Sequence, residues 1–239
     1  MCQMGIPILK GRLRGVRWSP MSGGKVLRVL AGTYETEQTA IVEHLVRPGD
    51  VVLDVGAHVG YYTMLFALLV GRSGHVFAFE PEPRNFAFLG QHAKLNGLEN
   101  VTAVNAAVGD QLGQVVFEYG SGSGTGHVVA SGIAGADPPR SNDARARSVS
   151  VRMGTIDDFA RANGIRVDVV KIDVEGAEMA VLQGAQSALR DSHPIIFLST
   201  HSADLHRECL DFLRGFGYEF APIVGRDLDR TTEVLCRVP

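Results

Sequence analysis

The chain has 239 residues, enough for one α/β domain with a substantial core, and 45% of them are hydrophobic, as in an ordinary globular protein. Its formal net charge of −3 gives no overall attraction to nucleic acid, and no apolar run is long enough to span a membrane. The N-terminus lacks the pattern of a signal peptide. We therefore predict a cytoplasmic protein that binds neither nucleic acid nor membrane. Its three cysteines, which have no C-x-x-C spacing, are predicted to be free thiols.

Residues 1–33 are predicted to form an N-terminal β extension made of short strands that glycines interrupt. One of these strands is expected at residues 26–30, after a turn at residues 22–25. We expect this extension to form a hairpin that packs either on the main sheet or on a second subunit, and the second alternative would give a homodimer. The main domain then comprises residues 34–239.

A strand, a tight turn and a helix follow one another at residues 51–70 and organise the rest of the chain. Residues 51–55 form a short β-branched run typical of a strand buried on both faces, and residues 59–70 have the length and apolar content of a helix. Gly56 allows a tight turn and a close approach of a ligand to the backbone. Ligands of open α/β folds bind at this carboxyl edge of the sheet, beside the helix N-terminus.

Strands and helices alternate along most of the chain. This alternation predicts an α/β fold with a doubly wound, mostly parallel seven-stranded sheet, helices on both faces and right-handed crossovers. The last two strands are expected to form an antiparallel edge pair, and Thr155 is expected to cap a helix that starts there. Strands are predicted at residues 51–55, 76–80, 101–106, 167–173, 195–200, 218–224 and 232–238, and further helices at residues 36–46, 84–96, 176–189 and 204–214.

An insertion at about residues 113–151 interrupts this alternation. Strand patterns at residues 115–119 and 148–153 flank a glycine–serine run at 120–126 and a segment rich in Pro, Asp and Arg at 136–147. They predict an inserted β-hairpin with a mobile tip rather than a domain boundary. The tip either caps a substrate or is a tolerated surface insertion.

Several predicted strands end in a carboxylate, and these carboxylates indicate which ligand the sheet edge binds. Asp54 and Glu80 end the first two strands, and Asp173 ends the fourth. A dinucleotide-binding turn needs spaced glycines, whereas His58 stands two residues after Gly56, and no phosphate loop of the NTPase kind is present. Acidic strand ends suit a cationic, hydroxyl-rich ligand better than a polyanion. S-adenosylmethionine has a sulfonium, an ammonium and a ribose diol, and it is the predicted cofactor.

Three strand ends and the turn at Gly56 supply the predicted cofactor contacts. Asp54 would partner the ammonium group, and Glu80 would accept both ribose hydroxyls. The adenine would lie against the end of the third strand. The complete predicted set is Asp54, Val55, Gly56, Ala57, Gly60, Tyr61, Glu80, Pro81, Asn105, Ala106 and Ala107.

Three acids, Asp173, Glu175 and Glu178, follow the fourth strand within six residues. They leave three interpretations open: a divalent metal that orients a substrate hydroxyl, an Asp173 that positions or deprotonates this hydroxyl, or helix capping with attraction for the sulfonium. His201, after the fifth strand, is a candidate general base near neutral pH. We predict Asp173 and His201 as catalytic residues without an assigned metal. The acceptor side is predicted to comprise Tyr34, Glu35, Glu175 and the loop at residues 120–126.

The motifs at residues 49–63, 79–81 and 170–178, in this order, resemble the FkbM family of S-adenosylmethionine-dependent methyltransferases, whose pattern residues 105–110 and 155–159 also match. The resemblance covers about residues 34–201. It implies a class I (Rossmann-like) methyltransferase fold, methyl transfer usually to oxygen, and cofactor contacts from Asp54, Gly56 and Glu80. The chain departs from the family at His58, where Asn is common, and at residues 198–201, near which the family often carries an acid.

These observations together predict an S-adenosylmethionine-dependent O-methyltransferase that acts on a small molecule such as a sugar or a natural-product scaffold. A nicotinamide-dependent oxidoreductase remains as one alternative, which the missing glycine disfavours. A catalytically silent binding module is the other, which the intact Asp54, Glu80 and Asp173 disfavour. An RNA methyltransferase is disfavoured by the mild acidity of the chain and by the lack of an appended basic domain.

Overall fold

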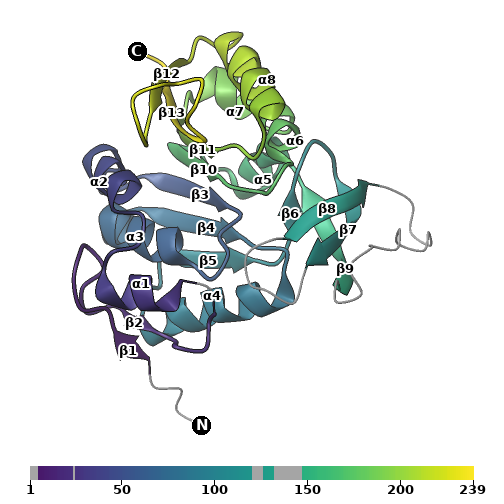
Figure 1. Ribbon diagram of the computed structural model, residues 1–239. Helices are drawn as coiled ribbons and strands as arrows, with labels where there is room; N and C mark the ends of the chain where they lie inside the picture. Colours follow the sequence, from purple (N-terminus) through teal and green to yellow (C-terminus); the bar gives the residue numbers. More distant parts are fainter. Residues whose placement is uncertain (1–4, 24, 120–125, 132–146) are drawn as a thin grey trace.

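A seven-stranded sheet forms the centre of the computed structural model, which describes residues 5–23, 25–119, 126–131 and 147–239 (Figure 1). Five adjacent strands run parallel, and the last two strands form the predicted antiparallel edge. The chain order reverses between β10 and β3, which is where open α/β sheets bind ligands. From one edge to the other, the strands are β12 (Glu219–Pro222), β13 (Glu233–Arg237), β11 (Ile195–Ser199), β10 (Val169–Ile172), β3 (Val51–Val55), β4 (His75–Phe79) and β5 (Val101–Val104).

Helices cover both faces of this sheet, as the alternation predicts (Figure 1). Neighbouring strand residues face opposite cores, so that Val52 packs with one group of helices and Leu53 with the other. One face is covered by α1 (Val26–Ala31), α2 (Thr36–Leu45), α3 (Tyr61–Val70), a 3₁₀ turn (Gly71–Ser73) and α4 (Pro83–Leu95), and the other by α5 (Ile156–Asn163), α6 (Glu178–Gln183), α7 (Gln186–Asp191) and α8 (Ala203–Arg214).

The N-terminal segment is only partly the predicted β extension. Its strands β1 (Ile6–Pro7) and β2 (Arg17–Trp18) form an antiparallel pair, and Trp18 stacks on His92 of α4 with ring centroids 3.8 Å apart. The segment therefore packs on α4 of the main domain, whereas the prediction placed it on the main sheet or on a second subunit. The prediction of a strand at residues 26–30 is wrong, because these residues belong to α1. The spacing of Val26, Val29 and Leu30 is helical, and all three pack in the core.

The single helix expected at residues 176–189 is instead two short helices, α6 and α7. They separate at Gly184, where a Cβ atom would lie 2.0 Å from the carbonyl oxygen of Gly109. The carboxylate of Asp157 accepts the N–H groups of Ser187 (2.7 Å) and Ala188 (2.9 Å) and so caps α7 from outside. Tertiary contacts therefore cause the break, because both partners, Gly109 and Asp157, lie far from Gly184 in the sequence.

The insertion is larger than the predicted hairpin. The two predicted strands are β7 (Gly113–Tyr119) and β9 (Arg147–Gly154), which pair antiparallel as expected. Two unpredicted strands join them in a separate four-stranded sheet, β6 (Ala107–Val108) beside β9 and β8 (Gly126–Ser131) beside β7. The tip at residues 120–126, predicted to border the acceptor, lies outside the described residues except for its last residue.

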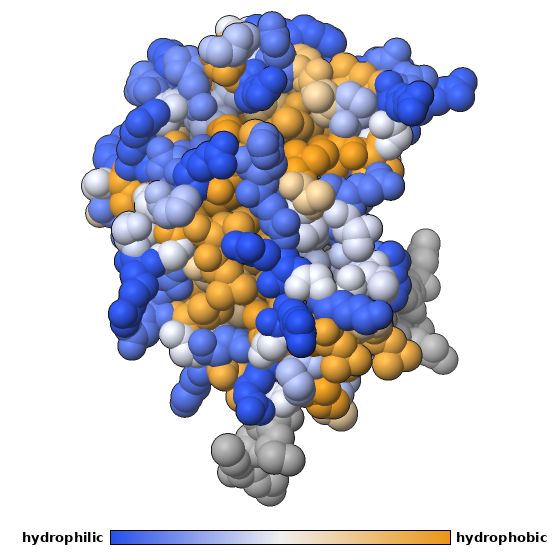
Figure 2. Space-filling view, turned by 90° about the vertical axis from the view of Figure 1, so that its left-hand side faces the viewer, coloured by the Kyte–Doolittle hydropathy of each residue, from blue (hydrophilic) through white to orange (hydrophobic). Residues whose placement is uncertain are grey.

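Apolar and hydrophilic residues are interspersed on the face that lies at the left of Figure 1 (Figure 2). Several large apolar side chains of the N-terminal segment are exposed, among them Leu27, Met21 and Leu9. Within the ranges that the structure describes, no helix is long and apolar enough to cross a bilayer. Cys209 and Cys236 are buried free thiols, as predicted, whereas Cys2 lies outside the described residues.

The contact between Gly184 and Gly109 generates the first prediction. Gly184→Ala is expected to lower the free energy of unfolding by about 1–3 kcal/mol, because the added methyl group meets backbone. Gly90→Ala in α4, where a Cβ atom would meet nothing within 4 Å, is the control and is expected to raise it by about 0.5–1 kcal/mol. Urea unfolding measures both variants. Equal stability of Gly184→Ala and the wild type would contradict the prediction.

Candidate active site

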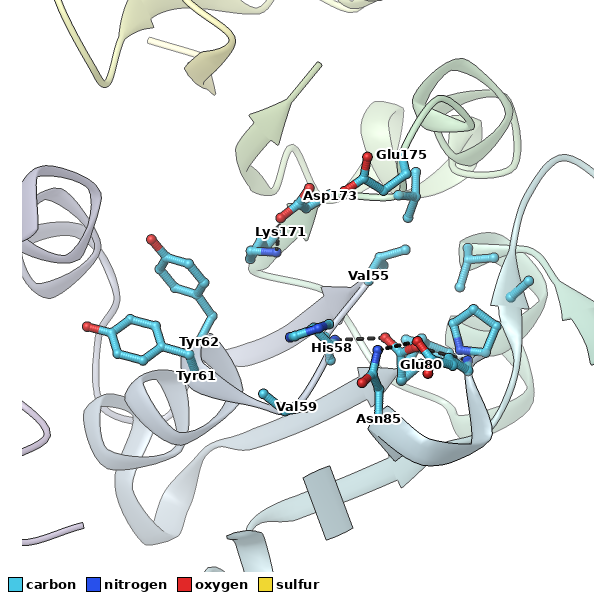
Figure 3. A pocket seen from close by; sticks show the side chains of 18 of the residues that line it. Val55, His58, Val59, Tyr61, Tyr62, Glu80, Asn85, Lys171, Asp173 and Glu175 are labelled. Atoms are coloured by element: carbon cyan, nitrogen blue, oxygen red, sulfur yellow. Dashed lines mark hydrogen bonds and ion pairs between the residues drawn. The ribbon is translucent and has the colours of Figure 1, made fainter. Parts of the chain in front are cut away.

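A cavity of about 360 Å³ lies at the carboxyl ends of β3, β4 and β10, where the chain order reverses (Figure 3). Residues from the N-terminal segment, from the turn after β3 and from the loops after β4 and β10 line it. The structure therefore brings together most of the side chains that the sequence singles out. The predicted residues that line the cavity are Tyr34, Glu35, Val55, Gly56, Ala57, Tyr61, Glu80, Pro81, Ala106, Ala107, Asp173, Glu175 and His201.

The turn after β3 needs glycine at position 56. Gly56 has a φ of +81°, and a Cβ atom there would lie 1.8 Å from the carbonyl oxygen of Asp173. The ends of β3 and β10 therefore meet without an intervening side chain. His58, two residues on, has a φ of +51°. Asn and His enter this left-handed region more readily than other non-glycine residues, which accounts for His where the family commonly has Asn.

Glu80 is buried at the end of β4 with its carboxylate held by two backbone groups. Its Oε2 accepts the N–H of His58 at 2.7 Å, and its Oε1 accepts the N–H of Glu82 at 2.9 Å (Figure 3). Burial raises the pKa of Glu80 to about 7, although both hydrogen bonds act against this rise. The carboxylate is thus fixed at the cavity wall, and its charge changes near neutral pH.

Asp54 does not line the cavity, so it does not face a ligand's ammonium group in the way that the sequence predicts. Its carboxylate is fully buried, accepts the hydroxyl of Thr63 at 2.6 Å and lies 3.8 Å from the Nζ atom of Lys171. Burial raises the pKa of Asp54 above its ordinary value, while Lys171 lowers it. Asp54 thus balances a buried lysine, and it acts on the cavity only through that lysine.

Lys171 was not predicted as a site residue. It lies opposite Asp54 in the β3–β10 register, and its Nζ atom is 3.3 Å from Oδ2 of Asp173. Burial lowers the pKa of Lys171, but the two carboxylates outweigh this effect and hold it above the ordinary value. A signal for this residue is present in the sequence, because a lysine inside an otherwise apolar strand requires a buried partner.

His201 is held among three carboxylates. Its Nδ1 atom donates to Oε1 of Glu178 at 2.7 Å, and its Nε2 atom is 3.3 Å from Oε2 of Glu175 and 3.6 Å from Oδ1 of Asp173. The hydrogen bond to Glu178 is the main reason why the pKa of His201 rises to about 9. At neutral pH this shift favours an imidazole that carries two protons in the ligand-free protein, whereas the role of His201 as a general base stays a prediction.

Glu233 on β13 is a further cavity residue that the sequence analysis missed. It lies opposite Ser199 in the β11–β13 register, and its Oε2 atom accepts the Ser199 hydroxyl at 2.7 Å. Burial raises its pKa to about 7. An acid therefore stands at the end of β11 in space, although residues 198–201 carry none. Only strand register brings it there, so the sequence contains no local signal for it.

Two predicted cofactor residues, Gly60 and Asn105, do not line the cavity. Gly60 precedes α3, and a Cβ atom on it would lie 2.7 Å from the Leu89 side chain. The amide nitrogen of Asn105 donates to the carbonyl oxygens of Glu80 (2.7 Å) and Pro81 (3.2 Å). Both residues shape the wall from behind. Further lining residues that were not predicted come from the N-terminal segment, the turn after β3 and α4, among them Trp18, Lys25, Val26, Val29, His58 and Asn85.

The cavity wall is acidic. Among the described lining residues, six carry carboxylates, two are lysines and His201 is a third basic side chain. Because negative charges in a low-dielectric wall repel an anion and attract a cation, this lining favours a positively charged ligand. The acids that produce this excess are Glu35, Glu80, Glu82, Asp173, Glu175 and Glu233, and the lysines are Lys25 and Lys171.

Comparison with known proteins places these features in context. A model of the FkbM methyltransferase domain matches residues 54–220. The hexuronic acid methyltransferase AglP of Haloferax volcanii is 27% identical over 150 residues, 62% of this chain and 54% of AglP, so the matched part spans about half of that relative. The 31-O-demethyl-FK506 methyltransferase FkbM of Streptomyces tacrolimicus is 29% identical over 192 residues, 72% of this chain and 74% of that protein. Among solved structures, Aeropyrum pernix fibrillarin with bound S-adenosyl-L-methionine shares the fold, with a TM-score of 0.50 at 15% identity over 84% of this chain and 73% of fibrillarin.

The buried lysine generates the second prediction. Lys171→Met is expected to lower the free energy of unfolding by about 3–5 kcal/mol, because Asp54 is then a buried charge without its counter-ion. The double variant Lys171→Met/Asp54→Asn is expected to recover part of this loss, and Lys94→Met, at an exposed position of α4, serves as control. Denaturant unfolding measures all three. A Lys171→Met variant as stable as Lys94→Met would contradict the prediction.

Proposed function

Because the chain belongs to the FkbM methyltransferase family, we propose that it transfers the methyl group of S-adenosylmethionine to a hydroxyl oxygen of a small organic acceptor. The family match covers residues 54–220, so the predicted family, the class I fold and the cofactor that belongs to it are confirmed. The observation that carries the proposed reaction is the cavity in which Glu80 and Asp173, at the ends of two strands that flank β3, face a common space beside Gly56.

The cavity offers complementary groups for each part of the cofactor. Glu80 is fixed by two N–H donors and retains lone pairs with which a ribose diol could form hydrogen bonds. Ala106 and Ala107 leave room for a flat base beside Pro81. A side chain at position 56 would collide with Asp173, so the bare backbone there can approach a ligand closely. The acidic lining suits the sulfonium and the ammonium.

The remaining side of the cavity would hold the acceptor. Tyr34 and Tyr61 pack edge to face there, with ring centroids 4.7 Å apart, and provide an apolar wall. Asp173 and Glu233 offer carboxylates to which a hydroxyl can donate. The names of the two relatives, one for a hexuronic acid and one for an oxygen of FK506, support a hydroxylated acceptor.

The proposed reaction is a direct displacement that needs alignment and exclusion of water more than covalent catalysis. S-adenosylmethionine supplies an electrophilic methyl group whose carbon–sulfur bond electrons return to sulfur. Asp173 would orient the acceptor O–H, whose oxygen pair forms the new O–C bond. The hydroxyl proton would pass to Glu233, whose raised pKa near 7 suits proton transfer at neutral pH. Without a metal ion, His201 would pair as a cation with the acids that surround it.

Cofactor binding tests the family-level part of this proposal. Calorimetry is expected to show binding of S-adenosylhomocysteine but not of NAD. The affinity is expected to fall as the pH is lowered through about 7, because the protonated Glu80 carboxyl accepts ribose hydroxyls less well. Glu80→Gln should weaken binding by about 10–100-fold and remove this pH dependence, while Glu99→Gln, at an exposed position, should change neither. Binding of NAD alone, or a wild-type affinity for Glu80→Gln, would refute the assignment of this site.

A labelled-methyl assay with hexuronic acids and macrolides tests the proton acceptor. Glu233→Gln is expected to lower kcat by about 10²–10⁴-fold and to remove the rise of the rate between about pH 6 and about pH 8, while the affinity for S-adenosylhomocysteine stays unchanged. The matched control is Glu219→Gln, at an exposed position of the neighbouring β12. Glu233 would be excluded as the proton acceptor if its variant kept the wild-type pH profile.

A further inference from the structure

Three side chains at the acceptor side of the cavity converge on one point. Asp173, Glu175 and His201 each offer a ligand atom, and these three atoms lie within 4.8 Å of one another. The Nε2 atom of His201 is 3.3 Å from Oε2 of Glu175 and 3.6 Å from Oδ1 of Asp173. Ligands at right angles around a divalent ion with bonds of about 2.1–2.5 Å lie about 3.0–3.5 Å apart. The distances from Nε2 to the two carboxylate oxygens are therefore close to those of a coordination sphere.

Glu178 adds a second and independent observation. Its side chain is fully buried, and its Oε1 atom accepts both the Nδ1–H of His201 (2.7 Å) and the N–H of Gly176 (3.0 Å). Its Oε2 atom has no hydrogen-bond partner among the described residues. A carboxylate that accepts a hydrogen bond from one ring nitrogen fixes the ring, so that the other nitrogen faces the metal. This is the usual arrangement of a metal-binding histidine. Here the forward nitrogen, Nε2, points to Asp173 and Glu175.

Carboxylates dominate the immediate surroundings of His201. Three carboxylates, those of Asp173, Glu175 and Glu178, surround one imidazole. Lys171 contacts only Asp173 among these acids, and it shares its charge with the buried Asp54. A divalent cation in place of the second imidazole proton would balance the three carboxylates more completely.

We propose that Asp173, Glu175 and His201 bind a divalent cation that accepts both carboxylate oxygen and imidazole nitrogen, such as Mn²⁺. All three residues line the cavity, so the ion has open positions on the acceptor side. On the basis of the proposed function, the ion holds the acceptor hydroxyl and lowers its pKa. The proton then passes to Glu233, the oxygen pair forms the bond to the methyl carbon, and the carbon–sulfur pair returns to sulfur.

Titration of the cofactor-free protein with Mn²⁺ alone, followed by the loss of the free-ion EPR signal, tests this site. The wild type is expected to bind one ion per chain. Glu175→Gln and His201→Asn each remove a ligand and should weaken binding by at least about tenfold. Glu178→Gln touches no ion but should weaken binding by about 10–100-fold, because the neutral amide is a weaker acceptor for the Nδ1–H and makes the imidazole a poorer ligand. Asp204→Asn, at an exposed position of α8 three residues after His201, should bind Mn²⁺ as the wild type does.

Calorimetry with S-adenosylhomocysteine on the same proteins separates this inference from the proposed function. Stoichiometric Mn²⁺ binding that the ligand variants lose supports the cation site, whether or not the cofactor product binds. Binding of S-adenosylhomocysteine without Mn²⁺ binding, or Mn²⁺ binding that Glu175→Gln and His201→Asn leave intact, overturns the cation site and leaves the methyltransferase assignment standing. Circular dichroism checks the fold of each variant. If Glu178→Gln does not fold, the half-exposed Glu175 and His201 variants decide the outcome.

Discussion

A buried ion pair between two neighbouring strands holds the site together. Lys171 on β10 reaches Asp54 on β3 on one side and Asp173 at the cavity on the other. Neither buried charge can lose its partner without a cost of several kcal/mol, so the two strands are held in one register and Asp173 in one orientation. Gly56 completes this junction, because only a glycine lets the turn after β3 lie against the backbone of Asp173. The acceptor side of the cavity is therefore built on the most deeply buried part of the sheet.

The site divides into two halves with different chemistry. On the β4 side, Glu80 is held by backbone N–H groups and changes charge near neutral pH. On the β10 side, Asp173, Glu175 and Glu178 surround His201 and raise the pKa of its imidazole. A hydroxyl-rich cofactor suits the first half, and a cation or an acceptor hydroxyl suits the second. Because the halves meet across the turn at Gly56, a cofactor bound in one half would face an acceptor bound in the other.

The sequence predicts those features of the fold that local pattern determines. The parallel strands can be predicted because strands buried on both faces have continuous apolar sequences. Thr155 caps α5 as expected, by accepting a hydrogen bond from the N–H of Asp158. What depends on distant contacts was missed. The register that joins Lys171 to Asp54 spans more than a hundred residues, and Glu233 reaches the site only through antiparallel pairing with β11. The break at Gly184 likewise depends on Gly109, and the valines and leucines of α1 favoured a strand until the tertiary packing was known.

Trp18 is the single tryptophan of the chain, and it both lines the cavity and stacks on His92. Its emission therefore comes from one place only, next to the space where ligands bind. Burial lowers the pKa of His92 to about 4, so the ring beneath the indole is neutral across the working range of pH. Intrinsic fluorescence of the unlabelled protein thus reports on this part of the cavity without background from other indoles.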